Sequence, residues 1–320
     1  MRADRALRLG GRRYDMFDSC VRVALDENEV QLCTAELTAA LGDTAAEETR
    51  ALFMPGTSAP QLPDFARMST LRALNVLSRS GWILDQLAEG RFTSWFHPIA
   101  HARDTSRIFG HEALLRGIER DGSLISPLPI FALAREAGLL LEVDSAASRS
   151  AIREAARTPG SGVVFINFSP AAIRDPQANL RATLQAIEEA GLARERVVFE
   201  VVEADRLGDA PGLAEILKGY REAGLRVALD DLGAGWSTLN LIHKLRPDFI
   251  KLDRELIRGI HLDPVKSVIA GKLIEIGRAL GIETIVEGVE EKAELDWAHD
   301  YGADYVQGFL LGEPRPVELS

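Results

Sequence analysis

Short apolar segments alternate with longer amphipathic segments from about Arg91 to the end of the chain. The short segments are rich in Val, Ile and Phe, and apolar residues in the longer ones recur at helical spacing. The strand candidates are Ser94–Ala100, Ile108–Arg116, Gly162–Ser169, Arg196–Val202, Leu225–Leu232, Asp248–Asp253, Glu283–Gly288 and Tyr305–Leu311. The helical stretches are Pro129–Arg157, Ala178–Ala190, Gly212–Ala223, Pro264–Leu280 and Lys292–Tyr301. This alternation predicts repeated βα units.

Eight strand candidates and about 230 residues fit a (β/α)8 TIM-type barrel, which occupies roughly 250 residues. Several helical stretches end in Gly before the next strand begins, as at Gly191 and Gly281. This repeated order of helix, glycine and strand fits an α/β barrel. It argues only weakly against an open doubly wound sheet. We therefore predict an α/β fold with the barrel over residues 91–320.

The first 90 residues follow a different pattern. Helical periodicity is present around Val30–Leu41 and Phe65–Leu87, and a Gly/Ser/Pro-rich break lies at Pro55–Pro63. We predict a small, mostly helical N-terminal appendage over residues 1–90. It either covers barrel surface or has a regulatory role, and the pattern favours the first.

Composition and charge limit the classes of function that the chain can have. Hydrophobic residues make up 46% of the chain and charged residues 27%, which is ordinary for a globular protein. The net charge of −11 argues against DNA or RNA polymers as the main partner. An acidic protein can still bind a phosphodiester if its carboxylates first collect divalent metals.

The cysteines and the N-terminal sequence indicate the cellular compartment in which the protein is expected. Cys20 and Cys33 are too few for a disulfide framework or a CxxC metal site. The basic N-terminus lacks the apolar core of a signal peptide, and no stretch of about 18 apolar residues occurs. We expect a cytoplasmic protein without a membrane span.

Polar residues stand toward the ends of the predicted strands, where barrel enzymes carry their chemistry. They are Glu112, Asn167, Glu200, Asp230, Asp231, Lys251, Glu287 and Gln307. Buried carboxylates need cations, and oxygen ligands without Cys or His select Mg²⁺, Mn²⁺ or Ca²⁺ over zinc. The adjacent Asp230 and Asp231 suit two ions about 3.5–4 Å apart. Taken singly, each residue could equally form a turn, a cap or an ion pair, so their joint placement carries the prediction.

These residues lie in ordered segments that resemble the EAL domain of cyclic di-GMP phosphodiesterases. The likeness runs from about Ser94 to Pro316. The segments are Phe96-His-Pro-Ile99, Glu112-Ala-Leu-Leu-Arg116, Ile166-Asn-Phe-Ser-Pro170, Glu200-Val-Val-Glu203, Asp230-Asp-Leu-Gly-Ala-Gly235, Lys251-Leu-Asp253, Val286-Glu-Gly-Val-Glu290 and Gln307-Gly-Phe.

The resemblance implies a hydrolase that opens cyclic di-GMP to linear pGpG with two Mg²⁺ or Mn²⁺ ions. It implies metal ligation by Glu112, Asn167, Glu200, Asp230, Asp231 and Glu287. Catalytic roles then fall on Lys251 and Gln307, which hold or deprotonate the attacking water, together with Glu112 and Glu287. Substrate contacts fall on Leu115, Arg116 and Asp253. Glu203 anchors the Gly233–Ser237 loop, and a homodimer is expected.

The chain departs from the family pattern at His97, Val202, Leu232, Ala234 and Trp236, where Gln, Thr, Phe, Thr and Tyr are usual. None of these removes an expected ligand. We interpret His97 as a packed or hydrogen-bonded strand residue in preference to a substrate contact. Two alternatives stay open: a receptor that binds cyclic di-GMP without cleaving it, and an unrelated metal-dependent barrel enzyme that uses Lys251 as a Schiff base or general base.

Overall fold

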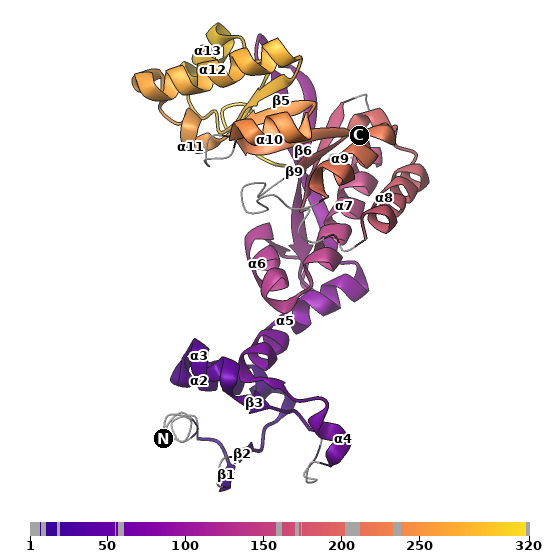
Figure 1. The fold of residues 1–320 in the computed structure, drawn as a ribbon, viewed down its shortest axis with the longest axis vertical. Helices are drawn as coiled ribbons and strands as arrows, with labels where there is room; N and C mark the ends of the chain where they lie inside the picture. Colours follow the sequence, from indigo (N-terminus) through magenta and orange to yellow (C-terminus); the bar gives the residue numbers. More distant parts are fainter. Residues whose placement is uncertain are drawn as a thin grey trace. The chain divides into compact units, whose positions relative to one another are not determined.

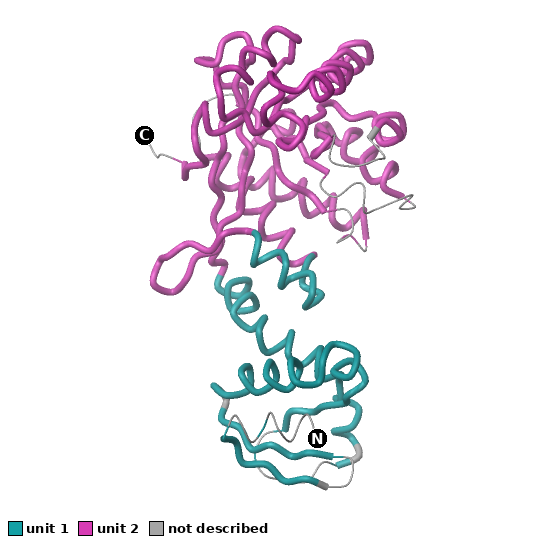
Figure 2. Tube along the Cα trace, turned by 90° about the vertical axis from the view of Figure 1, so that its left-hand side faces the viewer, with its two compact units in different colours: residues 1–89, 128–140 teal, residues 90–127, 141–320 magenta. Residues whose placement is uncertain are grey.

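The computed structural model describes residues 7, 11–17, 20–54, 56, 61–157, 162–169, 173, 175–201, 212–232 and 238–317. These residues divide into two compact units, shown in different colours in Figure 2. The first unit comprises residues 1–89 and 128–140, and the second comprises residues 90–127 and 141–320.

The second unit is a closed barrel. Its strands are β5 (Phe92–His101), β6 (Asp104–Ile118), β8 (Val163–Phe168), β9 (Val197–Val201), β10 (Arg226–Leu232), β11 (Phe249–Leu252), β12 (Glu283–Val286) and β13 (Tyr305–Gln307). They pair in the order β5-β13-β12-β11-β10-β9-β8-β6, and the pairing of β5 with β6 closes the ring. The short strand β7 (Leu124–Ile125) adds to β6. The predicted barrel and its strands are confirmed.

The first barrel strand runs against its neighbours. β5 pairs antiparallel with both β6 and β13, whereas β6 and β8 to β13 are joined by parallel pairings. Only Ala102 and Arg103 separate β5 from β6, which is hairpin length, and a parallel crossover needs a dozen or more residues. The βα alternation therefore begins after β6.

Helices surround the strands of this unit (Figure 1). They are α7 (Leu140–Arg157), α8 (Pro176–Ala190), α9 (Leu213–Glu222), α10 (Thr238–Leu245), α11 (Arg254–Ile257), α12 (Pro264–Leu280) and α13 (Lys292–Tyr301), with 3-10 turns η3 (Arg194–Arg196) and η5 (Ile260–Leu262). Asp263 caps α12 by accepting from two backbone N–H groups, and Gly281 ends the helix in the left-handed conformation (φ 70°). The helix predicted over 129–157 is two helices, because Gly138 (φ 70°) interrupts it.

Three apolar clusters hold the barrel together. One packs helices α7 to α10 against the outer face of strands β6 and β8 to β11, and a second packs α11 to α13 against β11 to β13. The third fills the interior with Ile99, Val163, Phe165, Val198, Ala228, Phe249, Ile285 and Tyr305, with Phe109 packed against them. The barrel is therefore a filled core rather than a pore, and polar side chains must lie beyond either end of this apolar plug.

The first unit combines helices and short antiparallel strand pairs. Its helices are η1 (Glu27–Glu29), α2 (Val30–Leu41), α3 (Asp43–Glu48), α4 (Leu62–Phe65), α5 (Leu71–Glu89) and most of α6 (Pro127–Ala137). Two antiparallel pairs accompany them: β1 (Tyr14–Phe17) with β2 (Cys20–Val23), and β3 (Arg50–Ala51) with β4 (Ser69–Thr70). The helical periodicity of residues 30–41 matches α2, whereas the short strands carry no comparable signal. Within the described residues, a helix that could cross a membrane is not found.

Candidate active site

A polar layer lies directly above the apolar plug of the barrel. Strand side chains alternate between faces, so residues two positions apart point the same way. Each polar residue follows an interior apolar residue by two positions: Asn167 after Phe165, Glu200 after Val198, Asp230 after Ala228, Lys251 after Phe249, Glu287 after Ile285 and Gln307 after Tyr305. The predicted strand-end residues therefore converge on one site at the carboxyl ends of the parallel strands.

Lys251 stands at the centre of this layer. Its side chain is only 1% exposed. Its Nζ lies 2.5 Å from Glu287 Oε1 and 2.9 Å from Glu200 Oε1. Asp230 Oδ1 and Glu112 Oε2 follow at 3.3 and 3.6 Å. One ammonium group thus contacts carboxylates from four different strands or strand ends.

Glu112 is held by further donors. The Asn167 amide donates from Nδ2 to Glu112 Oε1 at 3.0 Å, and the Gln307 amide donates from Nε2 to Glu112 Oε2 at 2.7 Å. Burial alone would raise the pKa of Glu112, but Lys251 and these two amide donors hold it below the usual value. Glu112 is therefore an ionised, acceptor-only group.

The other buried acids are less well compensated. Burial raises the pKa of both Glu200 and Glu287 well above the usual value, because the attraction of Lys251 does not offset it. Neighbouring carboxylates add repulsion at both residues. Burial opposes the charge on Lys251 too, but the surrounding carboxylates raise its pKa well above the usual value. The lysine is therefore a stable cation among acids that lack enough positive charge.

A bulge brings adjacent aspartates to the same site. In a regular strand Asp230 and Asp231 would point to opposite faces. The register of β10 against β11 shifts between Leu229 and Leu232, and Asp231 has a positive φ of 58°. With this bulge, ligand atoms of Asp230, Asp231 and Glu287 lie within 4.8 Å of one another. Burial raises the pKa of Asp231 to about 6, and repulsion from Asp230 and Asp253 adds to this effect.

The donor set fits divalent metal ions. Glu112, Glu200, Asp230, Asp231 and Glu287 supply carboxylates, and Lys251 is the one cation that contacts four of them in the described part of the site. Glu200 is 0% exposed, and its Oε2 has no hydrogen-bond partner in the described structure. Such an excess of buried negative charge is costly unless cations join it. Oxygen ligands suit hard ions such as Mg²⁺ or Mn²⁺.

The predicted substrate residues occupy different surroundings. Arg116 on β6 is half-buried, with its guanidinium 5.1 Å from the centre of the Trp95 ring. Asp253 follows β11, accepts from the backbone of Glu255 at 2.8 Å, and influences Asp231. Leu115 is buried and pairs with Ser94, on the strand face opposite Glu112 and Arg116 by alternation. Glu203 and the loop 233–237 lie outside the described residues.

His97 joins the polar layer although the strand-end rule passes over it. Its Nδ1 lies 2.9 Å from Gln307 Nε2, and it stands two residues before the interior Ile99. Because β5 runs antiparallel, its early residues lie at the end where the other strands finish. Strand direction was the missing information, and only the hairpin-length gap after His101 could have supplied it.

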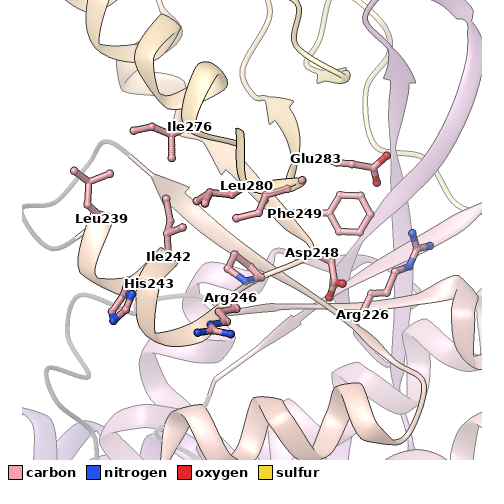
Figure 3. A pocket seen from close by; sticks show the side chains of 13 residues that line it. Arg226, Leu239, Ile242, His243, Arg246, Asp248, Phe249, Ile276, Leu280 and Glu283 are labelled. Carbon is pink, nitrogen blue, oxygen red and sulfur yellow. The ribbon is translucent and has the colours of Figure 1, made fainter. Parts of the chain in front are cut away.

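A separate cavity opens at the opposite end of the barrel strands (Figure 3). It has a volume of about 800 Å³ and is lined at the strand starts by Arg226, Asp248 and Glu283. Asp248 accepts from the backbone N–H of Val227 at 2.8 Å, and Glu283 accepts from the Tyr305 hydroxyl at 2.9 Å. Both acids are therefore hydrogen-bonded within the structure. Because the cavity lies at the strand starts, it is distinct from the carboxylate site at the strand ends.

Comparison with known proteins agrees with this geometry. The family model described as "EAL domain" matches residues 80–314. A probable cyclic di-GMP phosphodiesterase, PdeG of Escherichia coli, is 28% identical over 234 residues, which are 70% of this chain and 45% of that protein. The chain spans less than half the length of the curated relatives it matches first.

Two solved structures show the same fold with ligands. A standalone EAL protein from Vibrio cholerae, bound to c-di-GMP, is 33% identical with a TM-score of 0.64, covering 70% of this chain and 92% of its own. Klebsiella pneumoniae BlrP1, in a complex with manganese and cyclic di-GMP, is 27% identical with a TM-score of 0.64, covering 83% of this chain and 59% of its own. With its barrel, its polar layer and the matched family model, this chain belongs to the EAL domain family.

Proposed function

We propose that this protein is a cyclic di-GMP phosphodiesterase that hydrolyses one phosphodiester of cyclic di-GMP to give linear pGpG. The observation that carries the proposal is the group of oxygen ligands at this end of the barrel. Four of them contact Lys251, Asn167 donates to Glu112, and Asp231 lies beside Asp230 and Glu287. The PdeG relative and the c-di-GMP complexes of similar EAL proteins support the choice of substrate.

In this proposal Glu112, Asn167, Glu200, Asp230, Asp231 and Glu287 hold two Mg²⁺ or Mn²⁺ ions. Such ions, when bound, supply an activated water at neutral pH and stabilise charge on the phosphoryl oxygens. The acidic protein can therefore bind an anionic substrate, because the ions reverse the sign of the local field. These side chains would hold the ions at the end of the filled apolar core.

Lys251 and Gln307 act on the attacking water in this scheme. The ammonium of Lys251 stays protonated among its four carboxylate contacts, so it serves as a donor and a fixed positive charge near the reacting oxygens. Glu112 and Glu287, which both contact Lys251, fix its position. A protonated lysine cannot act as a Schiff-base nucleophile, which counts against an aldolase-type alternative.

Arg116 is the proposed phosphate clamp, because a guanidinium matches two phosphoryl oxygens and this one is held beside Trp95. Asp253 is the other proposed substrate contact. Leu115, whose side chain is buried on the opposite strand face, is proposed to contribute through its backbone carbonyl, which accepts from Arg116 Nη1 at 2.8 Å. Glu203 is proposed to anchor the 233–237 loop. The active form is proposed to be a homodimer, by analogy with the family.

Substitution of the ligands tests these roles. Glu112→Ala, Asp231→Asn and Lys251→Ala are each expected to lower kcat for cyclic di-GMP by about 10³-fold or more, because each removes a group from the metal or water site. Asn suits the Asp231 position because it tolerates a positive φ. Chromatographic assay of pGpG formation with Mn²⁺ measures the effect, with circular dichroism to confirm folding. Wild-type turnover in any two of the variants would refute the assignments.

A further inference from the structure

His97 and Gln307 form a hydrogen-bonded pair inside the polar layer. His97 comes from the antiparallel β5 and Gln307 from the end of β13, and Gln307 Nε2 lies 2.9 Å from His97 Nδ1. The same Nε2 lies 2.7 Å from Glu112 Oε2. Gln307 is 2% exposed, so bulk water does not compete for these contacts.

The chemistry of the partners fixes the orientation of the Gln307 amide. Both oxygens of Glu112 face donors, so Glu112 can only accept from Gln307. If the amide were flipped, two acceptor oxygens would stand 2.7 Å apart, which is repulsive. The NH₂ group must therefore face Glu112, and its second hydrogen points to His97.

The tautomer of His97 follows. Nδ1 must be the unprotonated acceptor, so the ring proton of neutral His97 resides on Nε2. His97 Nε2 is buried, and the backbone groups of Gly312 and Gly308 interact with the ring. A neutral histidine with this tautomer completes the donor-acceptor chain from His97 through Gln307 to Glu112.

This chain leaves one acceptor free. Gln307 Oε1 is buried and has no hydrogen-bond partner among the described residues. A buried amide oxygen without a partner is costly, and a bound water or hydroxyl would satisfy it. We propose that His97 is a positioning residue that locks the Gln307 amide, so that its carbonyl oxygen is presented as the acceptor for the attacking water.

The inference rests on the proposed hydrolysis for its kinetic consequence, but its structural part can be tested without turnover. Long-range proton–nitrogen NMR spectra of the full chain report the tautomer of each of the 6 histidines. Loss of one signal set in His97→Gln assigns His97. The inference requires an unprotonated Nδ1 in the wild type, and a proton on Nδ1 would overturn it.

Kinetics tests the positioning role. His97→Leu removes the acceptor and is expected to lower kcat on the order of tenfold with KM little changed, because Gln307 can then rotate. His97→Gln, which offers an amide oxygen at the same place, is expected to restore most of the lost kcat. A merely packed side chain would not distinguish these two variants, so equal losses in both, or wild-type kcat in His97→Leu, would overturn the inference.

The matched control is His101→Leu. His101 lies on the same strand and is similarly half-buried, with its ring 5.9 Å from Phe109 and 5.2 Å from Tyr305. It is expected to keep kcat within about twofold, because it lies in the plug layer. Failure of the wild type to hydrolyse cyclic di-GMP would refute the proposed function, while the tautomer spectrum would still decide the His97 inference.

Discussion

Lys251 combines two properties that rarely occur together in one side chain: it is 1% exposed, and it is charged. Its charge persists because four carboxylates contact it. The dependence is mutual, since Glu200 and Asp230 would otherwise be buried beside other acids. Removing the lysine therefore affects the stability of the barrel as well as its proposed activity.

We expect Lys251→Ala to lower the free energy of unfolding of the metal-free protein by about 3–5 kcal/mol, the usual cost of leaving buried charges without a partner. Urea unfolding in the presence of a chelator measures this. Lys272→Ala is the matched control, because Lys272 pairs with Glu275 at 2.7 Å with both side chains more than half exposed. Its loss should change the free energy by no more than about 0.5 kcal/mol. Equal effects of the two substitutions would contradict the central role of Lys251.

At this scale the polar strand-end residues were predictable, because alternation places them two positions after buried apolar ones. The bulge that turns Asp231 toward Asp230 was not, since a positive φ at an Asp leaves no distinctive sequence signal. The contact of His97 with Gln307 joins residues 210 apart in the chain, and no local pattern reports it.

Among the elements, helix α7 carries a buried acid with no role in the proposed chemistry. Asp144 is 6% exposed, and burial raises its pKa to about 7, partly opposed by the backbone of Ser169. Ser169 follows β8, two residues after the proposed ligand Asn167. Asp144 thus stands where α7 packs against the end of that strand.

The raised pKa of Asp144 predicts a pH-dependent stability. Below about pH 4 the carboxyl is protonated whether the chain is folded or not. Between pH 4 and 7 the folded protein retains the proton that the unfolded chain releases, so this contribution to stability falls as pH rises and is lost above pH 7. At 1.36 kcal/mol per pKa unit the loss is at most about 4 kcal/mol.

Asp144→Asn removes this titration. Urea unfolding at several pH values should find the variant as stable as the wild type near pH 4, and more stable than the wild type by a few kcal/mol at pH 8. The difference between the two proteins isolates Asp144 from other titrating groups. A constant difference across this range would show that burial does not perturb Asp144.

The strand and helix pattern predicted most elements, because each parallel strand is a short buried run followed by an amphipathic helix. It did not predict the direction of β5, since an apolar run is the same in either orientation. It also merged α6 and α7, because Gly138 interrupts a helical periodicity that continues on both sides.

The chain contains the barrel unit and the first unit, which consists of helices and short antiparallel strand pairs. Periodicity in the first 90 residues was enough to predict helices there but not the short strands, which have only two to four residues each. Curated relatives are more than twice as long as the matched region, so their regulation does not transfer directly.

The net charge of −11 affects which partners the whole molecule can bind. An acidic surface repels polyanions, yet a concentration of carboxylates above the barrel plug is suited to divalent ions and, through them, to a small phosphodiester. The competing function is a receptor that binds cyclic di-GMP without cleaving it. Both functions predict binding, so only turnover separates them.

The most direct measurement is therefore incubation of the purified chain with cyclic di-GMP and Mn²⁺ in ¹⁸O-labelled water, followed by chromatography and mass spectrometry. Hydrolysis predicts linear pGpG carrying one ¹⁸O atom in its terminal phosphate, and no product when a chelator replaces the metal. Cyclic di-GMP that remains intact after prolonged incubation with folded, nucleotide-binding protein would contradict the account and identify a receptor.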